Sequence, residues 1–337
     1  MNTSGPSPLW ISETEVVSMM DMGDAIKALE QGLLAEANLD AQNMVKTHVA
    51  WGDGSTLHAI GATLPKAGFA GTKTWAHTEG GATPLLILFD SDTGALKAII
   101  EAFALGQMRT ASASGLATEW LAAEDADDFA IVGTGKQAIT QVASVLAVRP
   151  IKRIRVFGRN EERLQQFAAR ARKEFELEVT PARSVAEAVE GVGVITVVTR
   201  AAEPVLSAEM IVTGAHVNAV GAIVPSRAEV AGNVLARCSQ IVVDSVPQAQ
   251  KLSRELIEFL GPPDQEGWKK VKSLAAVVDS RQPRDPGDDI TLFKSLGMGI
   301  SDLALGMRLY QKARDLGLGR EFPHPQRVAP RLHTGNR

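Results

Sequence analysis

An apolar run that leads directly into a glycine-rich turn constrains the fold of this chain more than any other feature. The run covers residues 129–132, and the turn reads Gly133-Thr134-Gly135-Lys136-Gln137-Ala138. Helical spacing follows to about residue 148, and a second apolar run at 154–157 ends in Gly158. This order of strand, turn, helix and strand predicts a β-α-β unit, the start of a doubly wound α/β domain.

The glycine turn has the chemistry of a dinucleotide phosphate site. A first glycine allows the tight turn, and a second lets the backbone approach a pyrophosphate. A small third residue, here Ala138, lets the helix pack on its strand, and the helix N-terminus attracts the phosphates. With an ordinary turn as the alternative, we expect a nicotinamide dinucleotide to bind at Gly133, Thr134, Gly135, Lys136 and Gln137.

The end of the second apolar run bears on the choice of cofactor. NAD sites place an Asp or Glu there to accept hydrogen bonds from the ribose, whereas an Arg accommodates the 2′-phosphate of NADP. This chain has Arg159 at that point, and its first carboxylate comes only at Glu161. Arg159 therefore predicts NADP, with a solvent-facing arginine at a helix start as the alternative.

The composition is that of a globular protein without a nucleic-acid partner. The 337 residues, 45% apolar and 22% charged, suit about two soluble domains. A formal net charge of −4 gives no reason to expect nucleic acid. No membrane-length apolar run or signal-like start is present, so we expect a cytoplasmic protein with no membrane partner. We expect no metal, because Cys238 is alone and no metal-ligand spacing joins His48, His58, His77, His216, His324 and His333.

The spacing of apolar residues along the rest of the chain indicates two kinds of region. Residues 13–36 predict one helix, and the short apolar runs of 44–100 predict a mainly antiparallel sheet. A helix over 104–123 leads into the dinucleotide-binding region. Its further elements are expected as strands at 178–180, 194–198, 216–220 and 240–244, with helices at 161–174 and 185–190. A helix over 300–316 returns to the first domain, and a surface tail follows.

Six segments occur together in the order of one enzyme family: 71–73, 108–118, 133–138, 197–199, 216–222 and 292–297. The most specific is RTASASGLAT, which begins at Arg109. With these segments the chain resembles the ornithine cyclodeaminase/mu-crystallin family of NAD(P)-dependent enzymes, whose members act on amino acids, cyclic imines and related ketimines. The resemblance implies a homodimer with a Rossmann NAD(P)-binding domain at 123–303. A mixed α+β substrate-binding and dimerisation domain would be formed from both chain ends, 1–122 and 304–337.

A small imino or amino acid carries a carboxylate, so its pocket needs fixed cations. Arg109 offers a bidentate fork, and Lys73 offers a point charge that can also move protons. By resemblance both line the substrate pocket, the alternatives being a helix-surface arginine and an exposed strand lysine. Lys46 is near the place of a substrate-binding cation in the family, although a solvated lysine fits equally well. His58 and His77 are either proton donors or ordinary core or surface histidines.

The resemblance assigns further residues to the cofactor side of the site. Thr199 is expected near the nicotinamide ribose, and Val220 against the nicotinamide ring, at the carboxyl edge of the sheet. Asp302, at the start of the last helix, is expected to be an acid favoured by the helix dipole. The other residues implied are Thr110 and Ser112, with helix packing as their alternative, and Lys294 and Ser295 on the nicotinamide side.

One departure from the family pattern bears on the reaction. Cyclodeaminases and alanine dehydrogenases of the family resemble each other in an Asp directly after the Val-Gly-Ala segment, where this chain has Ile223. That carboxylate activates water or the substrate amine, and an isoleucine cannot accept or deliver a proton. Glu229 is too far along to replace it and is expected to cap a helix. Mu-crystallin, a ketimine reductase, likewise lacks that Asp, which argues against ornithine cyclodeamination.

The resemblance and these residues together predict an NADPH-dependent ketimine reductase. Its substrate would be a cyclic ketimine carboxylate such as Δ1-pyrroline-2-carboxylate or Δ1-piperideine-2-carboxylate, reduced to proline or pipecolate. A preformed imine needs no activated water, which agrees with Ile223. The alternative within enzymes is an amino-acid dehydrogenase or an ornithine cyclodeaminase with another proton carrier. The alternative outside enzymes is an NADP-binding protein without turnover.

Overall fold

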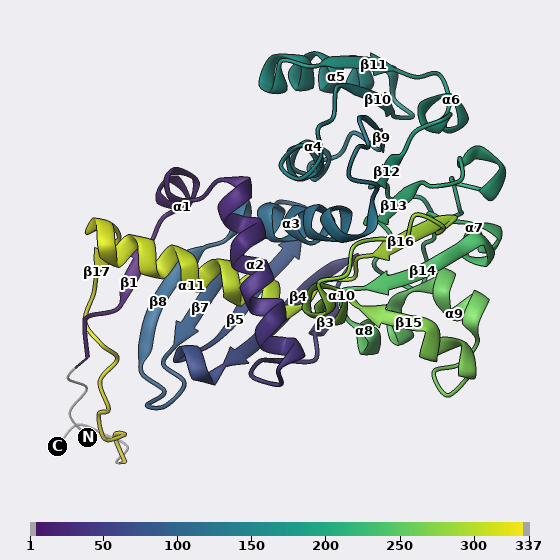
Figure 1. Ribbon diagram of the computed structural model, residues 1–337. Helices are drawn as coiled ribbons and strands as arrows, with labels where there is room; N and C mark the ends of the chain where they lie inside the picture. The colour runs from purple at the N-terminus through teal and green to yellow at the C-terminus, as the bar shows by residue number, and fades with distance from the viewer. Residues whose placement is uncertain (1–4, 333–337) are drawn as a thin grey trace.

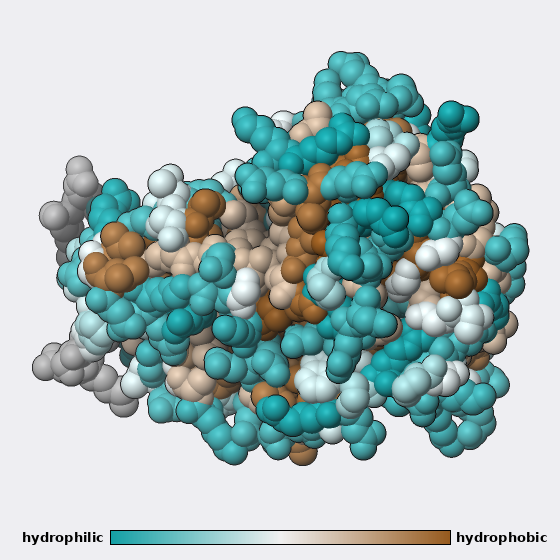
Figure 2. All heavy atoms as spheres, turned by 45° about the horizontal axis from the view of Figure 1, so that its top comes forward, coloured by the Kyte–Doolittle hydropathy of each residue, from teal (hydrophilic) through white to brown (hydrophobic). Residues whose placement is uncertain are grey.

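Two lobes, each built around one β-sheet, make up the computed structural model, which describes residues 5–332 (Figure 1). The expected surface tail lies partly outside this range, as does His333. Within residues 5–332, no helix is long and apolar enough to cross a membrane. Figure 2 shows a band of hydrophobic surface down the middle of one face, at the horizontal position that α3 (Phe103–Leu121) and α4 (Ala138–Leu146) have in Figure 1. These two helices pack on each other and so join the lobes.

The dinucleotide-type lobe holds an eight-stranded parallel sheet of order β11-β10-β9-β12-β13-β16-β14-β15. The strands β10 and β11 are added on one side of β9, and β12 and β13 on its other side, so the strand order reverses between β9 and β12. The carboxyl ends of β9 and β12 therefore border the crevice where doubly wound folds bind ligands. The strands are β9 (Asp128–Val132), β10 (Arg153–Phe157), β11 (Glu178–Pro181), β12 (Val194–Val197), β13 (His216–Ala219), β14 (Cys238–Val243), β15 (Val271–Ser273) and β16 (Ile290–Lys294).

The helices and strands predicted for this lobe from residue 128 to residue 244 are confirmed, with small shifts at their ends. The sequence predicted neither β15 and β16 nor the helices between residues 246 and 280, which are short and interrupted. The helices of the lobe are α4 (Ala138–Leu146), α5 (Glu161–Phe175), α6 (Val185–Val189), α7 (Gly232–Arg237), α8 (Val246–Leu252), α9 (Arg254–Leu260) and α10 (Leu274–Ser280).

The second lobe has a nine-stranded sheet of order β17-β1-β8-β7-β5-β4-β2, with β3 on β4 and β6 on β5. The antiparallel pairing predicted for 44–100 is confirmed, and the parallel pair of β1 with β8 brings in the start of the chain. The strands are β1 (Leu9–Ile11), β2 (Gln42–Asn43), β3 (Thr47–Trp51), β4 (Ser55–Leu64), β5 (Phe69–Thr78), β6 (Gly81–Ala82), β7 (Leu85–Phe89), β8 (Leu96–Glu101) and β17 (Arg320–Glu321).

Two N-terminal helices replace the single helix predicted over 13–36, so that prediction is wrong. They are α1 (Glu13–Met19) and α2 (Met22–Ala37). Met20 between them is extended, and the Asp21 side chain accepts a hydrogen bond from the amide of Asp24 as the N-cap of α2. An Asp in this position favours a new helix start over continuation of the old one.

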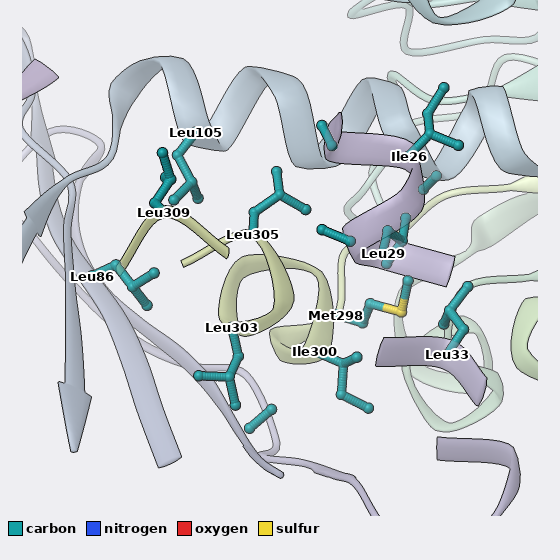
Figure 3. Close-up of a cluster of buried hydrophobic side chains, with 14 of the residues drawn as sticks. Ile26, Leu29, Leu33, Leu86, Leu105, Met298, Ile300, Leu303, Leu305 and Leu309 are labelled. Atoms are coloured by element: carbon teal, nitrogen blue, oxygen red, sulfur yellow. The ribbon is translucent and has the colours of Figure 1, made fainter. Parts of the chain in front are cut away.

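The core of this lobe forms around α11 (Gly299–Leu316), which lies between the sheet and the helices α2 and α3 (Phe103–Leu121). Figure 3 shows side chains of β7, α2 and α3 converging on α11, among them Leu86, Leu29 and Leu105. A Cβ on Gly299 would lie 1.8 Å from the carbonyl oxygen of Gly61, so α11 begins in backbone contact with β4. This contact brings the first turn of α11 to the sheet, although the sequence assigned residues up to 303 to the other domain.

Candidate functional site

The glycine turn after β9 is shaped for the close approach of a ligand. Gly133 has φ 120°, and a Cβ on it would lie 2.5 Å from the carbonyl oxygen of Val198. Only glycine fits there. Gly135 differs, because a Cβ on it would meet no protein atom within 4 Å. The second glycine therefore leaves room for something other than protein.

The same turn leaves hydrogen-bond donors free at the N-terminus of α4. Within residues 5–332, no protein group accepts a hydrogen bond from the backbone amides of Thr134, Gly135, Lys136 and Gln137. Free amides together with the helix dipole form an anion site. The residues predicted to bind the cofactor therefore have an arrangement that fits dinucleotide phosphates.

Arg159 stands beside this turn. Its side chain is exposed and has no hydrogen-bond or ion-pair partner among the described residues. A Cβ on Gly158, the residue before it, would lie 2.9 Å from Cγ2 of Thr134. The end of β10 therefore lies against the glycine turn, and Arg159 is the residue that follows this contact.

Glu229 joins the ends of β12 and β13, and the prediction that it caps a helix is wrong. Its Oε1 accepts hydrogen bonds from the amide of Thr199 at 2.6 Å and from the Thr199 hydroxyl at 2.9 Å. Its Oε2 accepts from the amides of Gly221 at 2.6 Å and Ala222 at 2.9 Å. The nearest following helix, α7, has Ala231 as its N-cap. The fully buried carboxylate thus fixes two loops at the carboxyl edge of the sheet.

Lys294 contacts Glu229 indirectly, through Glu255. Its Nζ lies 3.3 Å from Oε1 of Glu255, and that oxygen also accepts the amide N–H of Glu229 at 2.9 Å. Burial raises the pKa of Glu229, and the charge of Lys294 opposes that shift. The ammonium of Lys294 is thus already paired within the lobe. Contact of Lys294 with a nicotinamide stays a prediction, as does that of Val220, which is buried after β13.

Lys73, Arg109 and Asp302 meet between β5, α3 and α11. The Lys73 ammonium donates a hydrogen bond to Oδ1 of Asp302, and Nε of Arg109 lies 3.5 Å from the same oxygen. Lys73 is 4% and Asp302 1% exposed. The structure therefore brings together the two cations predicted to bind substrate. Asp302 is a buried ion-pair partner, which corrects the expectation of an acid favoured only by the helix dipole.

The environment of Lys73 makes its proton labile. Burial lowers the pKa of the Lys73 ammonium to about 8, with Arg109 and Lys46 acting in the same direction and Asp302 opposing them. Burial also lowers the pKa of Lys46, helped by Arg109. Lys46 is thus electrostatically part of the cluster, as the sequence suggested, and its contact with substrate stays a prediction. A lysine with a pKa near 8 can exchange its proton near neutral pH.

Asp244, which sequence reasoning missed, anchors the segment after β16 beneath Arg109. Its Oδ2 accepts hydrogen bonds from the Ser295 hydroxyl at 3.0 Å and from the amides of Leu296 at 2.8 Å and Gly297 at 2.7 Å. A Cβ on Gly297 would lie 3.2 Å from Nη1 of Arg109. The loop fixed by Asp244 therefore lies against the guanidinium of Arg109. The Ser295 hydroxyl is committed to this contact.

His58 and Trp75 form a stacked pair of rings next to Lys73. Its ring stacks on Trp75 with a centroid distance of 4.6 Å, and the Trp75 ring centroid lies 5.3 Å from Nζ of Lys73. Burial, followed by the charge of Lys46, lowers the pKa of His58 to about 4. His58 is therefore neutral at pH 7 and a poor proton donor there. His77 is exposed near the end of β5.

The hydroxyls of Thr110 and Ser112 are bonded within their own helix, to the carbonyl oxygens of Gly106 and Met108 at 2.9 and 2.7 Å. Ser112 is fully buried, as its helix-packing alternative requires. Ile223 is 38% exposed in the loop after β13. The loop position expected to hold a carboxylate in other members thus presents an apolar side chain.

The sequence model of the ornithine cyclodeaminase/mu-crystallin family matches residues 8–317. A Delta(1)-pyrroline-2-carboxylate reductase of Bacillus cereus is 31% identical over 243 residues, 71% of this chain and 73% of that protein. The ketimine reductase mu-crystallin of Mus musculus is 32% identical over 225 residues, 67% of this chain and 68% of that protein. The Thermococcus litoralis Delta(1)-pyrroline-2-carboxylate reductase, solved in complex with NADH and L-proline, has a TM-score of 0.86 and 28% identity, covering 93% of this chain and 100% of that one.

These similarities cover both lobes. They confirm the predicted mixed α/β fold and the prediction of an oxidoreductase. Together with the paired cations and the glycine turn, they show that the chain belongs to the ornithine cyclodeaminase/mu-crystallin family.

Proposed function

We propose that this chain uses NADPH to reduce a cyclic ketimine carboxylate to a cyclic amino acid such as proline or pipecolate. The observation that carries the proposal is the placement of Lys73 and Arg109 around the carboxylate of Asp302. The three cations Lys46, Lys73 and Arg109 act on two carboxylates, Asp244 and Asp302, so one positive charge is unmatched, and a substrate carboxylate would match it. The Bacillus cereus reductase and the Thermococcus litoralis complex with L-proline support this substrate class.

In this mechanism Arg109 and Lys73 hold the substrate carboxylate and so fix the imine carbon in one position. When bound at the glycine turn, a dihydronicotinamide cofactor would supply the hydride. Lys73, whose pKa is about 8, gives the imine nitrogen its proton. The stacked rings of His58 and Trp75 form an apolar flank that limits the entry of water. Positioning of the reacting atoms supplies much of the rate.

The choice of NADPH rests on Arg159. The glycine turn offers free amides to the phosphates of any dinucleotide, but Arg159 adds a free cation at the end of β10. A 2′-phosphate binds such a guanidinium through charge-assisted hydrogen bonds. The Thermococcus litoralis relative holds NADH, so the cofactor preference of this chain needs its own measurement.

We further propose a cytoplasmic homodimer that uses the outer face of β3 and β4. All five residues of β3 are exposed, with Val49 at 59% and Trp51 at 46%. Leu57, the cross-strand partner of Val49, is 46% exposed. Adjacent exposed apolar side chains mark an interaction surface, and an archaeal alanine dehydrogenase with 25% identity is a dimer in its structure. Val49→Lys should turn a dimer into a monomer by light scattering; a wild type that is monomeric at micromolar concentration would refute this proposal.

The proposed activity is tested by mixing the purified protein with NADPH and Δ1-piperideine-2-carboxylate or Δ1-pyrroline-2-carboxylate and following NADPH absorbance. Arg109→Ala should lower kcat/KM by about 10- to 100-fold, because it loses a charged hydrogen bond worth about 1.5–3 kcal/mol. Lys73→Ala should cost more, because it also removes the proton donor, which contributes about 10²–10⁴-fold. Lys97→Ala is the control, since Lys97 pairs with Asp90 in the same sheet. Ammonia from ornithine without net NADPH oxidation would mean a cyclodeaminase. Tight NADPH binding without turnover would mean a binding protein.

A further inference from the structure

Three ring side chains form a continuous stack beside the cation cluster. They come from three neighbouring strands: His48 on β3, His58 on β4 and Trp75 on β5. The ring centroids of His58 and Trp75 are 4.6 Å apart at an interplanar angle of 11°, and those of His48 and His58 are 5.5 Å apart at 23°. Strand pairing aligns the three, since His48 is opposite His58 and His58 is opposite Trp75. Rings in contact at these distances stabilise one another, so the stack is one defined surface.

The stack lies on the face of the sheet that carries Lys73. Side chains alternate along a strand, so Lys73 and Trp75, two residues apart on β5, point to the same side. The Lys73 ammonium lies over the Trp75 ring, 5.3 Å from its centroid, as this arrangement requires. The exposed apolar residues Val49 and Leu57 are each one position from a histidine of the stack, so they point to the opposite face. The stack is therefore separate from the proposed dimer surface.

The exposure of these side chains changes sharply along the sheet face. Lys73 is buried at 4% exposure. Trp75 and His58 are partly exposed, and His48 is exposed. The face thus passes from a buried cation to a partly open aromatic surface within two residues of β5. A partly exposed ring leaves area for contact with a ligand that is held by the cation beside it.

The separation of Lys73 and Trp75 suits a ring that carries a carboxylate. A carboxylate oxygen hydrogen-bonded to the Lys73 ammonium would lie about 2.8 Å from Nζ. In a cyclic ketimine carboxylate the ring is bonded directly to the carboxyl carbon. Such a ring is therefore within van der Waals reach of an indole whose centroid is 5.3 Å from the same Nζ. An open-chain imino acid has the same carboxylate but no ring to place against the indole.

The stack also has the electronic character that suits a protonated imine. A protonated ring imine is a flat cation, and the face of an indole attracts cations more strongly than that of the other aromatic side chains. Burial lowers the pKa of His58 to about 4, so its ring is neutral at pH 7 and adds no repelling charge beside Trp75. Nε2 of His58 lies 2.7 Å from the Thr56 hydroxyl, and this contact holds the ring in its stacked orientation.

We propose that Trp75, backed by His58 and His48, contacts the flat ring of the substrate and makes the enzyme prefer cyclic ketimine carboxylates to open-chain imino acids. This preference rests on the proposed imine reduction. Lys73 and Arg109 hold the carboxylate, which both kinds of substrate carry. Only a planar ring gains the additional contact with the indole face. Trp75 therefore determines specificity and takes no part in the transfer of the proton or the hydride.

The test compares Δ1-piperideine-2-carboxylate with the open-chain imine that pyruvate forms with methylamine. Trp75→Leu should lower kcat/KM for the cyclic substrate by about 3- to 30-fold, the effect of a lost cation–π contact. Most of this change should be in KM, and the open-chain imine should be unaffected. Trp75→Phe keeps an aromatic face and should recover most of the loss. Trp10→Leu is the matched control, because β8 and β7 separate Trp10 on β1 from β5. An equal loss for both substrates, or a phenylalanine no better than leucine, means a structural role and overturns the proposal.

A second measurement does not depend on turnover. Calorimetry in the presence of NADP+ compares pyrrole-2-carboxylate, whose ring is flat, with cyclopentanecarboxylate, whose ring is puckered. The wild type should bind the flat ring more tightly, because a flat ring stacks on the indole. Trp75→Leu should lose this preference and keep its affinity for the puckered ring. If the wild type reduces no cyclic imine, the proposed function fails, while the two affinities still decide the role of Trp75. Equal affinities in the wild type, no binding of either ring, or a preference that survives Trp75→Leu overturns the proposal.

Discussion

Replacing Glu229 by glutamine tests whether one ionised carboxylate fixes the carboxyl edge of the dinucleotide-type sheet. The group accepts four hydrogen bonds, two on each oxygen, from Thr199, Gly221 and Ala222. Glutamine keeps one acceptor oxygen and turns the other into an NH2 donor, so two of the four bonds are lost. A hydrogen bond to a charged group contributes about 1.5–3 kcal/mol. The expected loss in the free energy of unfolding is therefore about 3–6 kcal/mol.

The assay is urea unfolding followed by circular dichroism, with the dissociation constant of NADPH measured in parallel. Glu203→Gln is the matched control, because the Glu203 side chain is 75% exposed beside Arg254. That change should alter stability by less than about 1 kcal/mol. NADPH should bind more weakly to Glu229→Gln, since the loops of Thr199 and Val220 lose their common anchor.

The result also decides the ionisation state of Glu229. Burial raises its pKa, whereas the four donors and Lys294 favour the charged form. A protonated carboxyl already turns one O–H toward an N–H, and glutamine would then be nearly neutral in effect. A destabilisation below about 1 kcal/mol, no larger than at an exposed site, would refute the assignment of an ionised carboxylate.

Three further changes have expected outcomes. The kcat/KM for the imine should fall as pH rises through about 8, because Lys73 loses its proton there and the charge that holds substrate is present only below its pKa; a flat profile to pH 10 would contradict this. Arg159→Ala should raise KM for NADPH by about 10- to 100-fold through the loss of a charged hydrogen bond and leave KM for NADH unchanged, and an equal effect on both cofactors would refute the assignment. Gly133→Ala should unfold at clearly lower temperature, because its Cβ meets the backbone of Val198, whereas Gly135→Val should keep the melting temperature and lose dinucleotide affinity; the reverse pattern in calorimetry would show that the turn holds no phosphate.

Six of the eight strands of the dinucleotide-type sheet could be predicted from sequence because their signals are local, whereas β15 and β16 were missed. A buried parallel strand is a short apolar run, and the runs at 129–132, 154–157 and 216–220 each lead directly into a glycine. The helix over 13–36 was predicted wrongly because periodicity continues across Asp21, while the cap that starts α2 depends on one side chain. The short helices after β14 bury few residues each and leave no period to detect.

The substrate site was only partly predictable, since its contacts join distant segments. Lys73 and Asp302 are 229 residues apart, and nothing near Asp302 in the sequence indicates a lysine partner. Asp244 follows an ordinary buried strand, and its role arises when β14 and β16 pair and bring residues 295–297 to its carboxylate. Arg109 and Lys73 were identified through the family resemblance, but only the structure shows that both pair with the carboxylate of Asp302.

One continuous segment, from Lys294 to Asp302, links the two lobes at the site. Lys294 ends β16 in one lobe, Asp244 fixes the loop that follows, and Asp302 in the first turn of α11 holds Lys73 in the other lobe. The same loop lies under Arg109. A shift of this segment would therefore move both substrate cations relative to the dinucleotide-type sheet, and a misplacement of about 1 Å can cost a hundredfold in rate. Buried hydrogen bonds along this segment serve alignment as much as stability.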